Sequence, residues 1–131
     1  MKLLELYNDE DVYEYIKCKI PQNYKINKGL IYENEFLEPE GFILYHIEKD
    51  NIIFVDYLFV EDDEELLSDM IKKFDAFVKK KNKKLATQEQ VLINMIIITI
   101  KMKEEIINQF TDLKYKILKF NDPTCLIFKY I

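Results

Sequence analysis

The sequence contains no arginine and very little glycine. Its 19 basic residues are all lysines, and Gly29 and Gly41 are its two glycines. Without arginine, the protein cannot hold a phosphate, a carboxylate or a guanine through a two-pronged guanidinium fork. The formal net charge of −5 also opposes non-specific binding to nucleic acid, which depends on neutralising phosphates. We therefore expect no nucleic-acid partner.

Cysteine is scarce, and long apolar runs are absent. Cys18 and Cys125 lie far apart in the sequence and form no C-x-x-C motif, which favours reduced thiols over a disulfide. The apolar run after Met1 is too short for a signal peptide, and the most apolar stretch, residues 91–100, is too short to span a bilayer. We expect residues 1–131 to form a single cytoplasmic domain that contacts no membrane, and its oligomeric state stays open.

Hydrophobic spacing and turn residues divide the chain into alternating strands and helices. A strand at 2–7 precedes a helix that Asn8 caps and Pro21 ends. The other strands are expected at 29–36, 42–48, 52–60, 94–101, 114–120 and 124–131, and the other helices at 62–82 and 103–113. The order β-α-β-β-β-α-β-α-β-β predicts an α+β domain with a mixed, mostly antiparallel sheet of roughly six to seven strands and helices on both faces.

Two segments between residues 58 and 101 matter most for function. Five consecutive acids, Glu61 to Glu65, follow the apolar strand 52–60 and open the long helix, which lysines at 79–84 close, as a helix dipole favours. "TQEQ" at 87–90 resembles a capping box, and the β-branched run 96–100 instead favours a buried strand. We interpret 94–101 as a strand.

The element order resembles the GNAT superfamily, the acyl-CoA-dependent N-acyltransferases. "EGFILYHIEKDNIIFVDYLFV" is similar to the family's glycine-led strand, hairpin turn and following strand, which ends in an L-x-V pattern at Leu58 and Val60. "FTDLKYKI" at 110–117 falls where the family has Tyr-x-x-x-Gly-Phe. The resemblance implies a GNAT-like three-layer fold and acetyl-CoA as the cofactor.

The chain departs from that family at the residues that do its chemistry. The family's glycine-rich loop, which holds the cofactor pyrophosphate, is replaced by Glu61, Asp62, Asp63, Glu64 and Glu65, without glycine and with a shorter spacing. Phe110 stands at the position of the family's tyrosine acid, and Lys114 and Tyr115 at its Gly-Phe. Asp56 matches the place of an acidic general base, although an acid that pairs with a lysine or faces solvent would also fit there.

Three other features have structural explanations. The acid run is unlike a metal site, because successive residues that enter a helix splay around it; it favours helix initiation or an acidic docking patch. The lysines at 79–84 could bind nucleic acid or another anionic partner, but a stabilised helix C-terminus explains them more simply. His46, the single histidine, is expected to be a hydrogen-bonded core or edge residue, because no catalytic triad pattern accompanies it.

These observations favour a GNAT-like domain that has lost acetyl-CoA binding and acts as a non-catalytic binding or regulatory protein. The first alternative is a divergent N-acetyltransferase that holds acetyl-CoA through strand backbone and the lysines between 72 and 84, with Asp56 as the base. The second is a small acidic interaction or inhibitor protein that docks on a basic protein partner through residues 61–65. We expect no cofactor unless the first alternative holds.

Overall fold

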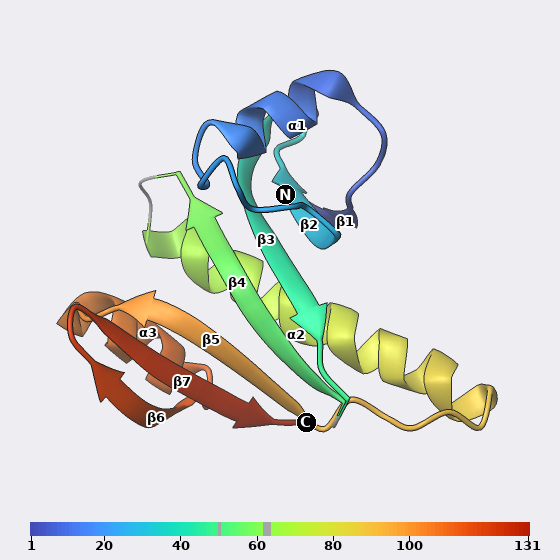
Figure 1. Ribbon diagram of the computed structural model, residues 1–131, viewed down its shortest axis with the longest axis vertical. Coiled ribbons are helices and arrows are strands. Elements are labelled where there is room, and N and C mark those ends of the chain that lie inside the picture. Colours follow the sequence, from blue (N-terminus) through green and yellow to red (C-terminus); the bar gives the residue numbers. More distant parts are fainter. Residues whose placement is uncertain (50, 62–63) are drawn as a thin grey trace.

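The computed structural model describes residues 1–49, 51–61 and 64–131, and within them the strands form one sheet (Figure 1). The sheet has the order β1-β2-β3-β4-β5-β7-β6, and all neighbouring strands are antiparallel except the parallel pair β4 and β5. The strands are β1 (Lys2–Glu5), β2 (Lys28–Glu33), β3 (Pro39–Ile47), β4 (Ile52–Val60), β5 (Met95–Lys101), β6 (Lys116–Asn121) and β7 (Thr124–Tyr130). The helices are α1 (Glu10–Lys17), α2 (Glu64–Thr87) and α3 (Glu104–Asp112).

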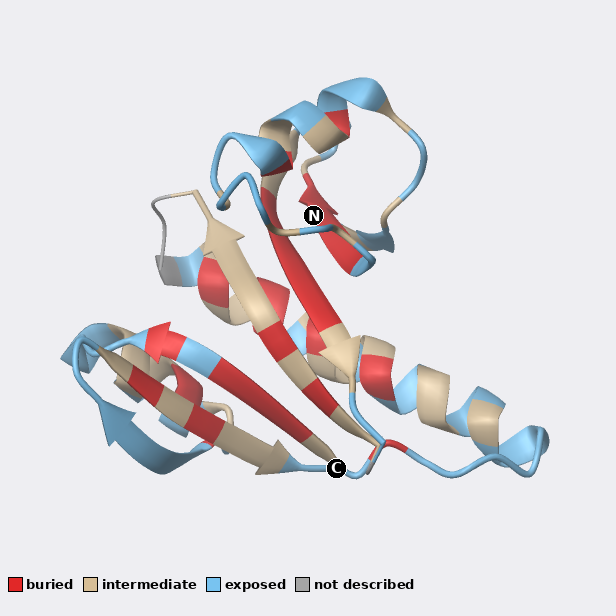
Figure 2. Cartoon of the chain, viewed as in Figure 1, coloured by how far each residue is buried: buried red, intermediate tan, exposed pale blue. Residues whose placement is uncertain are grey.

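Helices cover the two faces of the sheet unequally, which makes the three-layer α+β architecture that the sequence predicts. On one face, α2 and α3 pack on the larger apolar core, which includes the buried Phe74 and Phe110. On the other face, α1 packs through Val12 and Ile16 on residues of β2 and β3. Figure 2 shows the buried residues concentrated along the central strands and on the sheet-facing side of α2. Cys18 and Cys125 are both free thiols, as expected.

The segment at 94–101 is a strand, which confirms the interpretation based on its β-branched residues. β5 pairs with β4 and β7, so Ile96, Ile97 and Ile98 are buried between two neighbouring strands. "TQEQ" starts no helix, because Thr87 is the last residue of α2 and Glu89 takes a left-handed backbone conformation with φ of 55°. Tertiary pairing with two strands therefore decided this segment over its local helical signals.

The boundaries of α1 and α2 differ from the predicted ones. Asp9 caps α1 rather than Asn8, because the Asp9 carboxylate accepts hydrogen bonds from the backbone N–H groups of Asp11 (2.9 Å) and Val12 (3.1 Å). α2 runs to Thr87 rather than to residue 82, since the residues between are good helix formers and include neither glycine nor proline. The longer α2 places the lysine cluster ahead of the helix end.

Candidate functional site

The two parallel strands of the sheet separate after a short paired stretch. Pairing between β4 and β5 runs from Ile52–Met95 to Val55–Ile98, and both strands then continue, β4 to Val60 and β5 to Lys101. The cause lies on the other side of β4. The register between β3 and β4 shifts between Leu44 and Tyr45, so Asp56 has no residue opposite it on β3. Such a bulge bends the strand and increases its twist. The free ends of β4 and β5 therefore diverge, as Figure 1 shows.

A cleft of about 490 Å³ lies between the diverging strands. Its lining is mainly apolar and comes from the ends of both strands, the first turns of α2, and α3: Leu58, Phe59, Val60, Leu67, Ile100, Ile106 and Phe110. The charged residues in the lining are Glu61, Lys101, Lys103 and Glu105. A long ligand with an apolar body would fit this cleft, and charges of both signs would meet its polar parts.

Asp56, the predicted general base, sits at the bulge and is held by two neighbours. The Tyr24 hydroxyl donates to Asp56 Oδ2 (2.8 Å), and His46 Nδ1 lies 2.9 Å from the same oxygen. His46 Nε2 lies 2.9 Å from Glu48 Oε1, and its ring stacks on Phe54 with 5.3 Å between the ring centroids. Asp56 therefore pairs with a histidine and a tyrosine, so the sequence-based alternative of a lysine partner is wrong.

His46 is the bridge of this cluster. The hydrogen bond to Asp56 raises its pKa, burial opposes that shift, and Glu48 adds to it. A protonated imidazole would donate from both ring nitrogens, one to each carboxylate. The expectation of a hydrogen-bonded histidine is confirmed, but its contact with Asp56 was missed. The predicted hairpin between 42–48 and 52–60 could have indicated this contact, because it places His46 opposite Phe54, two residues from Asp56.

The acid run begins inside the cleft and continues along α2. The Tyr15 hydroxyl donates to Glu61 Oε1 (2.8 Å), and the Glu61 backbone N–H donates to the Glu40 carbonyl oxygen (2.8 Å). Burial and the bond to Glu61 raise the pKa of Tyr15, so its hydroxyl stays a donor at neutral pH. Asp62, Asp63 and the Glu64 side chain lie outside the described residues. Glu61 is thus bonded to α1 through its side chain and to β3 through its backbone N–H.

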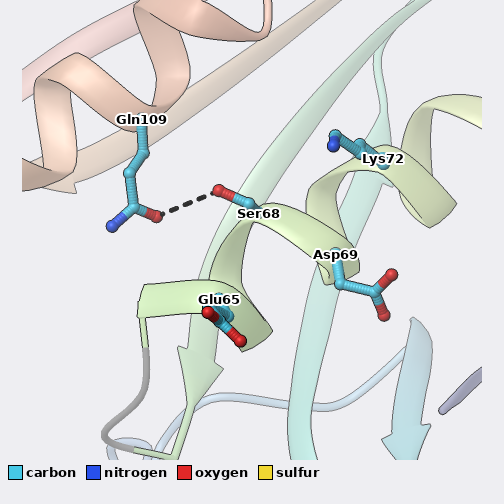
Figure 3. A pocket seen from close by; sticks show the side chains of 5 residues that line it. All are labelled: Glu65, Ser68, Asp69, Lys72 and Gln109. Carbon is cyan, nitrogen blue, oxygen red and sulfur yellow. Dashed lines mark hydrogen bonds between the residues drawn. The ribbon is translucent and has the colours of Figure 1, made fainter.

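A second, shallower hollow of about 390 Å³ lies beside the first turns of α2 (Figure 3). Glu65, Ser68, Asp69 and Lys72 of α2 line it with Gln109 of α3, and Ser68 donates to Gln109 Oε1 across 3.4 Å. Asp69 also bonds Lys73, at 2.6 Å, and Tyr32. The carboxylates of Glu65 and Asp69 therefore lie along the first turns of α2 together with the ammonium groups of Lys72 and Lys73. The described residues contain no group of three or more acidic, histidine or cysteine side chains fit to hold a metal ion.

Phe110 and Tyr115 are both buried, and neither supplies a hydroxyl to the cleft. Phe110 lines the cleft, and its ring meets that of Tyr115 edge to face at 5.3 Å. The Tyr115 hydroxyl points elsewhere and donates to Asp75 Oδ1 (2.9 Å), while Lys129 Nζ lies 2.6 Å from Asp75 Oδ2. Lys114 is exposed in a left-handed backbone conformation (φ 74°). The Asp75 network was not predicted from the sequence, although Asp75 interrupts the apolar stripe of α2 between Phe74 and Phe77.

The chain is similar to known proteins in its fold but not in its sequence. No protein-family model matches the chain, and no curated protein matches it. Solved structures match over almost the whole length. An acetyltransferase of the GNAT family from Staphylococcus aureus aligns with a TM-score of 0.65 and 13% identity over 98% of this chain and 99% of that one. The protein has the GNAT fold.

Other solved structures align over a similar length. The GNAT-fold domain aligns with aminoglycoside 6'-acetyltransferase type Ii at a TM-score of 0.64 and 13% identity, covering 99% of this chain and 97% of that one. A domain from Methanocaldococcus jannaschii aligns at 0.67 and 8% identity, with 99% of each chain covered. At such identities, likeness shows the fold alone. Function must come from the site.

Proposed function

We propose that this GNAT-fold domain no longer binds acyl-CoA and acts as a non-catalytic binding or regulatory protein. The observation that supports this most is the junction between β4 and α2. Three residues, Glu61, Asp62 and Asp63, connect Val60 to the first residue of α2, and none of them is glycine. A pyrophosphate needs several backbone N–H groups that converge on it at close range. The Glu61 N–H bonds the Glu40 carbonyl, so this backbone donor is not available to a phosphate.

The negative charge at the start of α2 also opposes the binding of a phosphate. A phosphate about 5 Å from a carboxylate costs on the order of 1 kcal/mol per pair near a protein surface. The attraction of a helix N-terminus, about 0.3–1 kcal/mol, cannot offset several such pairs. Glu61 lines the cleft and Glu65 lines the hollow beside it, so carboxylates stand on both sides of the α2 start. The apolar cleft suits the body of an acyl-CoA, but its phosphate end does not fit here.

The position of the family's tyrosine acid also supplies no hydroxyl to the cleft. Phe110 has no hydroxyl, and the Tyr115 hydroxyl is bonded to Asp75. Without the cofactor and the acid, the domain is left with surfaces for binding. The run Glu61 to Glu65 is the proposed contact for a basic protein partner, through charge complementarity.

Titration of the purified protein with acetyl-CoA and with CoA tests this proposal. We expect no heat of binding and no thermal stabilisation at about 1 mM ligand, where a micromolar site would add roughly 4 kcal/mol of stability. A variant with Glu61→Gln and Glu65→Gln separates charge from backbone. It should also stay unbound, because the substitutions bring no glycine into the connection and the backbone therefore still cannot approach the phosphates closely. Micromolar binding by the natural sequence would overturn the proposal.

A divergent N-acetyltransferase is the second candidate. It is favoured by the cleft between β4 and β5 and by Asp56, which lies at the bulge of β4 two residues before Leu58, the first residue of β4 in the cleft lining. In this case Lys101 and Lys103, which line the cleft, would meet the cofactor's negative charge instead of the lysines between 72 and 84. Asp56, with His46 beside it, would accept the substrate proton. Release of free CoA thiol from acetyl-CoA with amine substrates, lost in Asp56→Asn and kept in Glu48→Gln, would support this candidate.

A further inference from the structure

The end of α2 projects beyond the sheet and carries the densest positive charge in the chain. The buried stripe of α2 ends at Val78, and the helix continues to Thr87 with mostly exposed side chains (Figures 1 and 2). Lysines occupy positions 79, 80, 81, 83 and 84. None of them forms an ion pair with a described residue, although Lys81 Nζ lies 6.0 Å from the centre of the Phe77 ring.

Helix stability does not account for these lysines. The dipole of a helix favours cations within its last turn, and Lys84 is the only one of the five in that turn. The others face one another at spacings of three and four residues, as Lys79 does with Lys83, and like charges at this spacing destabilise a helix. The sequence-based explanation therefore covers one lysine of the group. The cluster is better explained by an anionic surface outside the protein.

Two exposed aliphatic side chains lie in the segment that returns from the end of α2. Val91 is 73% exposed and Leu92 is 44% exposed. The chain after α2 folds back along the helix end, because the Asn82 side chain bonds both the N–H and the C=O of Ile93 at 2.8 Å. A backbone bond from Gln90 N–H to the Leu85 carbonyl (3.0 Å) closes the same return. Val91 and Leu92 therefore share one end of the molecule with the lysines.

We propose that this basic tip, residues 79–84 with Val91 and Leu92, docks on an anionic lipid membrane surface. Each lysine near such a surface adds about fivefold to the affinity, and aliphatic side chains can enter the interfacial layer. A nucleic acid fits less well, because aliphatic side chains cannot stack on bases and the chain has no arginine. This tip accounts for the lysines and the exposed apolar pair together.

The net negative charge of the protein does not prevent this contact. The lysines at 79–84 follow the start of α2 at Glu64 by 15 to 20 residues, so about 22–30 Å of helix separates the acidic start from the basic tip. That separation is several times the Debye length of about 8 Å at physiological ionic strength. No helix among the described residues is long and apolar enough to cross a bilayer. The sequence-based expectation of no membrane contact rested on apolar length alone, which does not address a peripheral contact.

Co-sedimentation with phosphatidylcholine vesicles, with and without phosphatidylserine, tests the proposal. We expect binding to the phosphatidylserine vesicles only, weakened by salt. Replacing Lys79, Lys80 and Lys83 with Gln should lower the affinity about a hundredfold. The double variant Val91→Ser and Leu92→Ser should lower it about tenfold. We expect each variant to fold, because the replaced side chains are mostly exposed, and circular dichroism checks this.

A matched control makes the same charge change elsewhere. Replacing the exposed Lys114, Lys116 and Lys119 with Gln should leave the affinity within about twofold, because these residues lie around β6. Equal binding to both vesicle types, no binding to either, or an equal loss in the control would overturn the proposal. So would tighter binding to duplex RNA than to the phosphatidylserine vesicles, unaffected by the Val91 and Leu92 changes. None of these outcomes depends on whether acyl-CoA binds.

Discussion

Asn82 is the residue whose removal we expect to reveal most about how the chain holds β5 in place. Its side-chain amide accepts from the Ile93 N–H and donates to the Ile93 carbonyl, both at 2.8 Å. Ile93 is only 2% exposed and immediately precedes the segment that enters the sheet at Met95. The double bond therefore fixes where the chain leaves α2 and returns to the strand. Asn82→Ala removes both contacts without adding volume.

The expected loss of stability follows from the two backbone groups left without a partner. Each unpaired buried group costs about 1–3 kcal/mol. Asn82 is only partly buried and water can replace some of the contact, so we expect a total loss of about 3 kcal/mol. With a urea m-value of about 1.5 kcal/mol per molar, this would lower the unfolding midpoint by about 2 M.

Urea unfolding followed by far-ultraviolet circular dichroism measures this effect. The matched control is Gln88→Ala, an exposed residue of the same returning segment, whose change should shift the midpoint by less than about 0.3 M. If Asn82→Ala shifts the midpoint no further than the control does, the two hydrogen bonds do not hold the return. A changed m-value would instead indicate that the variant alters how much structure unfolds.

Two further predictions concern the sheet and its histidine. Gly41→Ala should destabilise the fold by about 1–3 kcal/mol, because its Cβ would lie 2.5 Å from the Phe59 carbonyl oxygen; Gly29→Ala should cost less, since its two closest contacts are the ends of leucine side chains, and thermal unfolding would rank the pair. His46 has a raised folded pKa, so its contribution is complete below the unfolded value of about 6.5 and is lost as pH rises through the folded pKa. Since the side chain is 41% exposed, we expect roughly 0.2–1 kcal/mol, measured as the pH-dependent part of stability that His46→Gln removes; an unchanged pH profile in that variant would contradict this sign.

Much of the fold followed from local patterns. The strand 52–60 was predicted with its observed boundaries, because a short run of β-branched and aromatic residues bounded by turns has few other solutions. The apolar stripe of α2 identified the helix, but its end was missed, since lysine-rich sequence continues a helix as readily as it ends one. The resemblance in element order led to the right fold at an identity too low for any family model to match.

Less of the candidate site could be predicted. Asp56 was placed in its strand, but its partners His46 and Tyr24 come from two other segments. The bulge that separates β4 from β5 depends on the pairing of β3 with β4, and no residue type in the sequence marked it. Hydrogen bonds between distant segments depend on register, which local periodicity does not specify.

The junction between β4 and α2 illustrates the division. Sequence alone determined that this junction is acidic, short and without glycine, because composition and spacing are properties of the chain itself. Only the tertiary structure decided that a cleft opens beside it, that Glu61 bonds Tyr15 there, and that α2 carries its lysines past the edge of the sheet. Those features arise where two strands diverge and where a helix extends beyond the surface on which it packs. Both depend on contacts between segments far apart in the chain.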